Sequence, residues 1–334
     1  MSEPTLTLGY VDFAKEIGLF QGWKIDDVSA PAGWALDSDR LALVDLIIQS
    51  ALRTFYYDAR DERGRKHKWN FFKPLEDLII WPEATGETEG APVYDDEAYS
   101  EVTAAAATFY PSMVGKTLSF DDSGGGDYVI ASYTSSTVVT VVGDASAEGD
   151  EADFTIEADG DYRLPDNFGG IDGDVTFVGA NTTAQIHIGS EQSIRARRGQ
   201  GDSTGRPWLV AVMPLASTGA AGQRWVFMVW PTPDEVYTMR FRTNAHPNKI
   251  STSNPYPLGG TAHGQTILEG CLAEAERRRG DTTRIHENRY RELLVSSIAE
   301  DRTAGAPENM GYCGPGYEQI HTSRLRGVVS YEGE

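Results

Sequence analysis

The chain has few of the features that mark secreted, membrane-embedded or metal-binding proteins. Its two cysteines, Cys271 and Cys313, allow at most one disulfide and form no metal-binding spacing. No apolar run reaches the ~18 residues that a transmembrane helix needs. The first residues, MSEPTLTLGYVDFAKEIG, lack the basic stretch and apolar core of a secretory signal. These absences predict a soluble protein that is made in a cytoplasm and has no membrane partner.

The sequence also lacks the short motifs that accompany common enzyme chemistries. It has no GxSxG, no phosphate-cradling GxxxxGK[ST] and no GxGxxG between a strand and a helix. The six histidines are scattered, so a zinc site would need several loops to converge. We therefore expect no cofactor, no metal and no enzymatic activity.

Two clusters of aspartates leave open the alternatives of a calcium site and of a hydrolase. Asp121, Asp122 and Asp127 flank a run of small residues, and carboxylates suit calcium, but their spacing does not match the twelve-residue calcium loop. Asp172 and Asp174 could supply the acid and base of a glycosidase. With 50 acidic residues in the chain, such neighbours are expected by chance. Turn chemistry and a solvated surface explain them more simply, and a carboxylate-based hydrolase is the least favoured function.

Negative charge is what the sequence has in excess, with 50 acidic against 29 basic residues and a net charge of -21. Nucleic-acid affinity rests on Lys and Arg that neutralise phosphates, so tight duplex binding is not expected. The excess indicates either a solvated surface or a channel wall that repels DNA. The acidic loops at 83–97 and 144–153 are the main candidates for such a wall. The basic cluster at 60–68 is expected to meet an acidic partner surface.

Apolar residues at three- and four-residue spacing predict helices near both ends of the chain. Asp37 or Ser38 can cap the longer N-terminal helix. A tight loop at 280–281 predicts that the last two helices form an antiparallel pair. Cys271 falls on an apolar helix face, which favours a core residue over a nucleophile. The predicted ranges are 10–19, 38–58, 261–279 and 283–303.

Between these helices the pattern is typical of strands. Residues 115–163 contain four short β-prone runs separated by turn residues. The continuous apolar runs at 208–213 and 224–230 predict strands covered on both faces. The Pro-Thr-Pro-Asp turn at 231–234 predicts a hairpin between 224–230 and 235–242. The other expectations are a strand within 68–82, an exposed acidic loop at 83–97 and a helix at 98–110.

Together these patterns predict an α+β fold. The N- and C-terminal helices are expected to form a helical bundle, with a central β-domain and an inserted small antiparallel β-domain. The predicted regions are an N-terminal helical region with an edge strand and acidic loop (1–110), the inserted β-domain (111–161), the central β region (162–253), the C-terminal helical hairpin (254–303) and an extended tail (304–334).

Two groups are candidates for contact with a partner. Arg277, Arg278 and Arg279 end a predicted helix, where cations favour the helix dipole but could also meet another protein. The tail is rich in glycine and polar groups, yet it carries apolar residues with no local partner, which predicts folding against a neighbour. These tail residues are Tyr312, Tyr317, Ile320, Leu325, Val328 and Val329.

Four segments together resemble the phage head-to-tail connectors, or neck adaptor proteins. They span most of residues 5–303, and their order matches as well as their content. They are LIIQSALRTFYYDA followed by HKWNFFKP, GDYRLPDNFGGIDGDVTF, GQRWVFMVWPTPDEVYTMRFR, and YPLGGTAHGQTILEGCLAEAERRR with YRELLVSSIAEDR. None of these segments is catalytic. The strand-rich region at 115–160 departs from the smaller adaptors, which lack so large a β-insertion.

The resemblance implies a structural protein of the virion neck. It implies a homo-oligomeric ring of about twelve copies that is closed by rotation. The ring would dock beneath the portal protein, contact a tail or neck protein below, and let genomic DNA pass without binding it tightly. The alternative is another tail-associated or receptor-facing virion protein, since Ser-, Thr- and Gly-rich strands such as those at 115–160 often decorate a surface.

Overall fold

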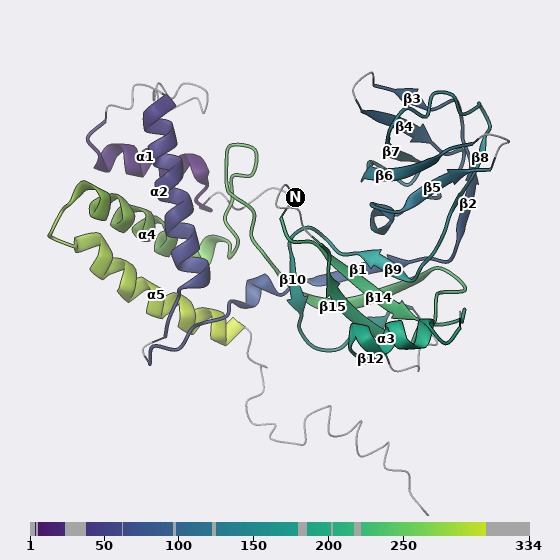
Figure 1. Cartoon of the computed structure of the whole chain (residues 1–334). Helices are drawn as coiled ribbons and strands as arrows, with labels where there is room; N and C mark the ends of the chain where they lie inside the picture. The colour runs from purple at the N-terminus through teal and green to yellow at the C-terminus, as the bar shows by residue number, and fades with distance from the viewer. Residues whose placement is uncertain are drawn as a thin grey trace, which may run out of the picture. The chain divides into compact units, whose positions relative to one another are not determined.

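The fold is mixed α+β, as the sequence predicts. The computed structural model describes residues 4, 6–23, 38–61, 63–95, 98–121, 125–179, 186–201, 203–216 and 222–304. The chain divides into two compact units (Figure 1). Unit 1 contains the described residues of Met1–Phe71 and Lys249–Glu334, and unit 2 is Phe72–Asn248.

Unit 1 is helical in its described part, and its helices match the predicted ranges. They are α1 (Tyr10–Phe20), α2 (Ser38–Tyr57), α4 (Thr261–Arg279) and α5 (Ile285–Ala304). Helix α4 packs against each of the other three. It ends at Gly280, whose φ of 76° is left-handed and therefore suits glycine. The expected cap at residue 37 lies outside the described residues.

The buried face of α4 confirms the prediction for Cys271. The thiol is fully buried and free, and burial raises its pKa. Ile267 and Ala275 are buried on the same face, one turn before and one turn after it. A thiol in this environment stays protonated and packs as a small apolar group.

Unit 2 contains three sheets in its described residues. The first joins β1 (Leu75–Ile80), β15 (Tyr237–Ala245), β10 (Phe168–Ile171) and β11 (Thr176–Phe177). The second runs β12 (His187–Ile188), β13 (Leu209–Pro214), β14 (Trp225–Trp230) and β9 (Asp161–Arg163). The third runs β2 (Ala84–Glu87), β8 (Asp153–Ile156), β5 (Thr117–Phe120), β6 (Asp127–Tyr133), β7 (Val138–Val142), β4 (Tyr99–Thr103) and β3 (Val93–Tyr94). One apolar core contains residues from all three sheets.

The predicted hairpin across residues 231–234 is wrong. Strand β14 pairs with β13 and β9, whereas β15 pairs with β1, β10 and β11. Both edges of β14 are therefore occupied, and the turn carries the chain from one sheet to another. The related prediction of burial on both faces is confirmed, because Phe227 and Val229 enter the main core while Val226 and Met228 enter a second cluster.

Two further predictions need correction. Residues 83–97, expected as an exposed loop, contain the strands β2 and β3, and residues 98–110, expected as a helix, contain β4. Burial in β4 alternates, with Ser100 and Val102 inside and Tyr99 and Glu101 outside, which is the period of a strand. In β2, a side chain at Gly86 would lie 2.5 Å from the ring of Phe154 on β8, so glycine is required there.

The structure also contains a helix that the sequence analysis missed, α3 (Glu191–Arg198). It packs on β13 and β14 through Ile194, its one buried residue. The available signals were Ser190, which caps the helix by accepting from the Ser193 amide, and Gly199, which ends it. With Ile194 and Ala196 as its two apolar residues in eight, the helix has no periodicity that a sequence pattern can detect.

Candidate interaction surfaces

The described residues contain no group of three or more His, Cys, Asp or Glu that could hold a metal ion. Asp121 accepts a hydrogen bond from the Thr155 hydroxyl at 2.9 Å, Asp127 begins β6, and Asp122 lies outside the described residues. Asp172 forms an ion pair with Lys73 at 2.8 Å. Asp121, Asp127 and Asp172 therefore take part in local structure, as turn and surface residues do.

The three arginines predicted to meet a partner lie together at the exposed end of α4. Arg277 and Arg278 both pair with the buried carboxylate of Glu274, and the Arg278 contact measures 2.7 Å. Arg279 donates to the carbonyl of Phe20 at 3.1 Å and lies over its ring. Each arginine thus has an internal partner. The six tail residues predicted to bind a partner lie outside the described residues.

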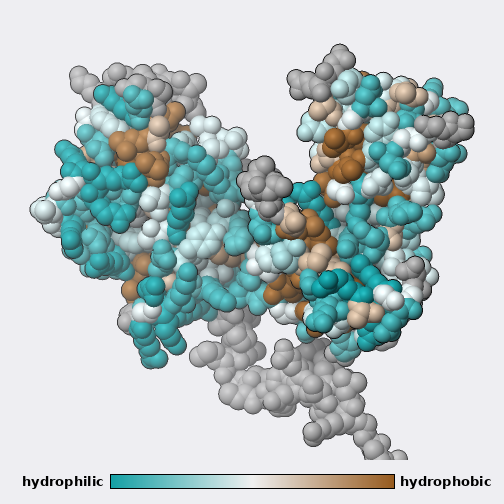
Figure 2. Space-filling model, in the orientation of Figure 1, coloured by the Kyte–Doolittle hydropathy of each residue, from teal (hydrophilic) through white to brown (hydrophobic). Residues whose placement is uncertain are grey.

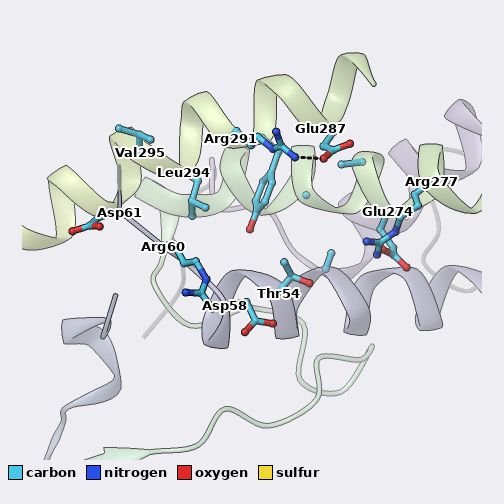
Figure 3. A pocket seen from close by; sticks show the side chains of 14 residues that line it. Thr54, Asp58, Arg60, Asp61, Glu274, Arg277, Glu287, Arg291, Leu294 and Val295 are labelled. Atoms are coloured by element: carbon cyan, nitrogen blue, oxygen red, sulfur yellow. Dashed lines mark hydrogen bonds and ion pairs between the residues drawn. The ribbon is translucent and has the colours of Figure 1, made fainter. Parts of the chain in front are cut away.

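A pocket of about 410 Å³ lies between α2, α4 and α5 (Figure 3). Arg291 pairs with Glu287 along α5, and Arg277 pairs with Glu274 on α4, so much of the lining charge is compensated. The hydroxyl of Tyr290 is buried without a hydrogen-bond partner among the described residues, and burial raises its pKa. The lining offers no nucleophile beside a general base, so its chemistry does not indicate catalysis.

Strands β2 and β8 bring together the two acidic segments that the sequence analysis treated as separate loops. We call the exposed carboxylates on or next to these strands the acidic edge; they are Glu83, Glu87, Asp153 and Glu157. Glu87 lies directly opposite Asp153 in the antiparallel pair. Like charges in this position repel each other, so a cation from another molecule would stabilise the acidic edge.

A second charged surface lies around α3 and the adjoining strand ends. We call it the arginine–aromatic surface; it comprises Arg197, Arg206, Phe177, Trp208, Trp230 and Tyr237. The guanidinium of Arg197 lies 5.0 Å from the ring centroids of both Trp208 and Trp230. The guanidinium of Arg206 lies 4.4 Å from the ring of Phe177 and 5.9 Å from that of Tyr237. Aromatic faces hold a guanidinium without using its N–H groups.

Two other arginines of α3 differ from Arg197 because they form ion pairs with carboxylates. Arg195 pairs with Glu191 and Arg198 pairs with Asp161, each at 2.8 Å. Arg197 and Arg206 have no carboxylate partner within the part of the chain that the structure describes. Thr204, two residues before Arg206, forms an isolated β-bridge with Thr232, two residues after Trp230. The surface therefore presents two guanidinium groups held by aromatic rings, next to the Asp234 carboxylate to which the Tyr237 hydroxyl donates at 2.8 Å.

None of the helices in the described ranges combines the length and the apolar content that a membrane span requires. A family model described as SU10 adaptor protein matches residues 98–311, which is more than half of the chain. The match begins just before β4 and extends beyond the end of α5. No curated protein matches the chain.

Proposed function

Because this chain belongs to the SU10 adaptor protein family, we propose that it joins the portal of a phage head to the tail, as one subunit of a ring around the DNA channel. Membership makes it a phage structural adaptor of the virion that associates with other virion proteins, and this is not an enzyme class. The match over 98–311 carries the proposal, because it includes three of the four segments that resemble neck adaptors.

The helices of unit 1 support this role. Helix α4 contacts α1, α2 and α5, so segments from both ends of the chain build one helical part, which we take to be the predicted bundle. Its N-terminal and C-terminal helices are thereby fixed to each other, and the tail begins at the end of α5. A ring subunit that docks on a portal needs such a rigid support for its docking segment.

Electron microscopy tests the proposal on the full chain, alone and mixed with the portal protein. We expect rings in one or both samples, with the adaptor ring stacked on the portal ring. A chain that stays monomeric at every concentration and does not bind portal would contradict the proposal.

The alternative, a receptor-facing virion protein, is favoured by one observation. Tyr99, Val129 and Val142 lie in direct cross-strand register on β4, β6 and β7, and their side chains are 42%, 46% and 48% exposed. Figure 2 shows apolar side chains on the surface of this part of unit 2. Such a patch is typical of a binding surface. Labelling residues 115–160 on intact particles distinguishes the two, since a position far down the tail favours the alternative.

Removing residues 305–334 is expected to leave the helices folded but to weaken portal binding by at least about tenfold. The tail carries apolar residues such as Tyr317 and Leu325, which we expect to be buried on docking. Sedimentation of the truncated chain with portal measures the effect. A full-length chain with Tyr317→Ser and Leu325→Ser keeps the tail but loses two of its apolar side chains, and we expect it to bind portal more weakly as well. Binding equal to that of the intact chain would show that docking uses other residues.

The isolated chain is expected to show no measurable binding to duplex DNA at physiological salt. Its net charge is -21, and part of the basic cluster at 60–68 is neutralised by Asp61. Backbone and side-chain hydrogen bonds from Arg65, together with one from Arg302, hold the pKa of Asp61 well below its usual range. A gel-shift titration measures this; tight binding that weakens with salt would overturn it.

A further inference from the structure

We propose that the arginine–aromatic surface of one copy binds the acidic edge of the next copy, and that this contact joins neighbouring subunits. The proposal rests on the proposed ring and names the surfaces that build it. Each copy then offers one cationic and one anionic surface. Because the two surfaces differ, the contact is head-to-tail, and such contacts close into a ring when the rotation allows.

The arginine–aromatic surface has hydrogen-bond donors that lack acceptors. The Nε atom of Arg206 and the Nε1 atom of Trp230 are buried and have no partner among the described residues. Arginine and tryptophan side chains donate and cannot accept, so their partner has to be an acceptor such as a carboxylate. Both atoms are covered by the chain's own side chains, whereas Arg197 is exposed, so the guanidinium of Arg197 is the donor group that a carboxylate of another copy can reach.

The acidic edge, in turn, has carboxylates that lack a cationic partner among the described residues. Glu87 and Asp153 oppose each other across the β2–β8 pair, and no ion pair involving either carboxylate occurs among the described residues. A guanidinium placed between two such carboxylates would replace repulsion with two charge-assisted hydrogen bonds. Strand β2 is also the outer strand of its sheet, so its side chains are accessible to another molecule.

The chemistry favours a protein carboxylate over a DNA phosphate at this surface. Tryptophan, tyrosine and arginine are the residues that contribute most to protein–protein binding energy, and all three occur here. Duplex DNA would also have to approach a chain whose net charge is -21, whereas a second copy brings exposed carboxylates on a preformed strand pair.

Within one chain, the arginine–aromatic surface and the acidic edge are not paired with each other. No hydrogen bond or ion pair between described residues joins them, and in Figure 1 α3 lies apart from the β2–β8 edge within unit 2. A second copy is therefore needed to bring an acidic edge to Arg197 and Arg206.

Charge reversal tests the pairing in the full chain. We expect Arg197→Glu with Arg206→Glu, and separately Glu87→Lys with Asp153→Lys, to raise the concentration for half assembly by about a hundredfold or more. Mixing the two variants is expected to restore assembly, because each then presents the charge that the other lacks. Analytical ultracentrifugation measures assembly, and circular dichroism checks that each variant is folded.

Single reversals at sites outside the two surfaces serve as matched controls. Arg195→Glu changes the same helix at an arginine with no aromatic stack, and Glu101→Lys changes an exposed residue on β4; both are expected to assemble like the unchanged chain. Assembly of both double variants, or loss of assembly without rescue on mixing, would overturn the proposed pairing. Duplex DNA retention that depends on Arg197 and Arg206 would identify a nucleic acid as the occupant and overturn it too. An unchanged chain that forms no ring, with or without portal, would overturn the adaptor role itself.

Discussion

Replacing Trp69 with alanine is expected to lower the free energy of unfolding of unit 1 by about 3–5 kcal/mol. The indole is 1% exposed, and its ring lies 4.5 Å from Phe55 and 5.2 Å from Phe71. His67 and His263 approach it at 4.7 and 5.3 Å. Removing the ring leaves a cavity among aromatic groups that cannot collapse to fill it. Denaturant unfolding followed by circular dichroism of the helices measures the loss.

Trp69→Phe is the matched control. It keeps an aromatic ring but loses the indole N–H, which donates to the Phe55 carbonyl at 3.0 Å. We expect a smaller loss of about 1–2 kcal/mol, close to the value of one buried hydrogen bond. If Trp69→Ala unfolds within about 0.5 kcal/mol of the unchanged chain, the ring is not central to the core of unit 1.

Replacing Asp301 with alanine is expected to lower the free energy of unfolding of unit 1 by about 2–4 kcal/mol, because the groups that hydrogen-bond to its carboxylate lose that partner. The Asp301 side chain is 5% exposed and lies 2.9 Å from the Nε2 atom of His67. Its carboxylate also accepts from the Asn70 amide at 3.1 Å. Without it, the buried His67 ring and the Asn70 backbone amide both lose this partner.

Glu300→Ala is the control for Asp301→Ala, because Glu300 is an exposed carboxylate one position earlier on α5. A change within about 0.5 kcal/mol is expected there. Thermal unfolding of both variants compares them directly. Equal effects at the two positions would show that Asp301 acts through net charge rather than through its contacts with His67 and Asn70.

The sequence predicted the helices of unit 1 well because each has a long apolar face. In α4, Ile267, Cys271 and Ala275 recur at four-residue spacing, and Gly280 marks the end. The residues of α3 gave no such signal. Its position depends on Ile194 meeting two strands that lie later in the sequence, which is tertiary information.

Strand partners were the part of the fold that the sequence could not supply. The turn at 231–234 looked like a hairpin turn, but β14 already has partners on both edges. Strand β2 was not predicted because glycine and glutamate are uncommon in strands. Gly86 is explained by the ring of Phe154, which lies opposite it on β8. Local pattern does not specify which strands pair, because pairing depends on distant residues.

The candidate surfaces, like the fold, were only partly predictable from the sequence. Both acidic segments were visible as charge, but their meeting on adjacent strands became apparent only from the pairing of β2 with β8. The arginine–aromatic surface combines residues from 177 to 237 through strand pairing and the bridge between Thr204 and Thr232. The arginines at 277–279 were predicted from the sequence to contact a partner, which stays a prediction, and the structure shows the internal partners of each.

Electron cryomicroscopy of intact phage particles tests the proposed position of this protein most directly. We predict a ring of density directly beneath the portal that fits the four helices of unit 1 and the seven-stranded sheet of unit 2. Density for the chain found only further down the tail, or no copy of the chain in the particle, would contradict the adaptor role.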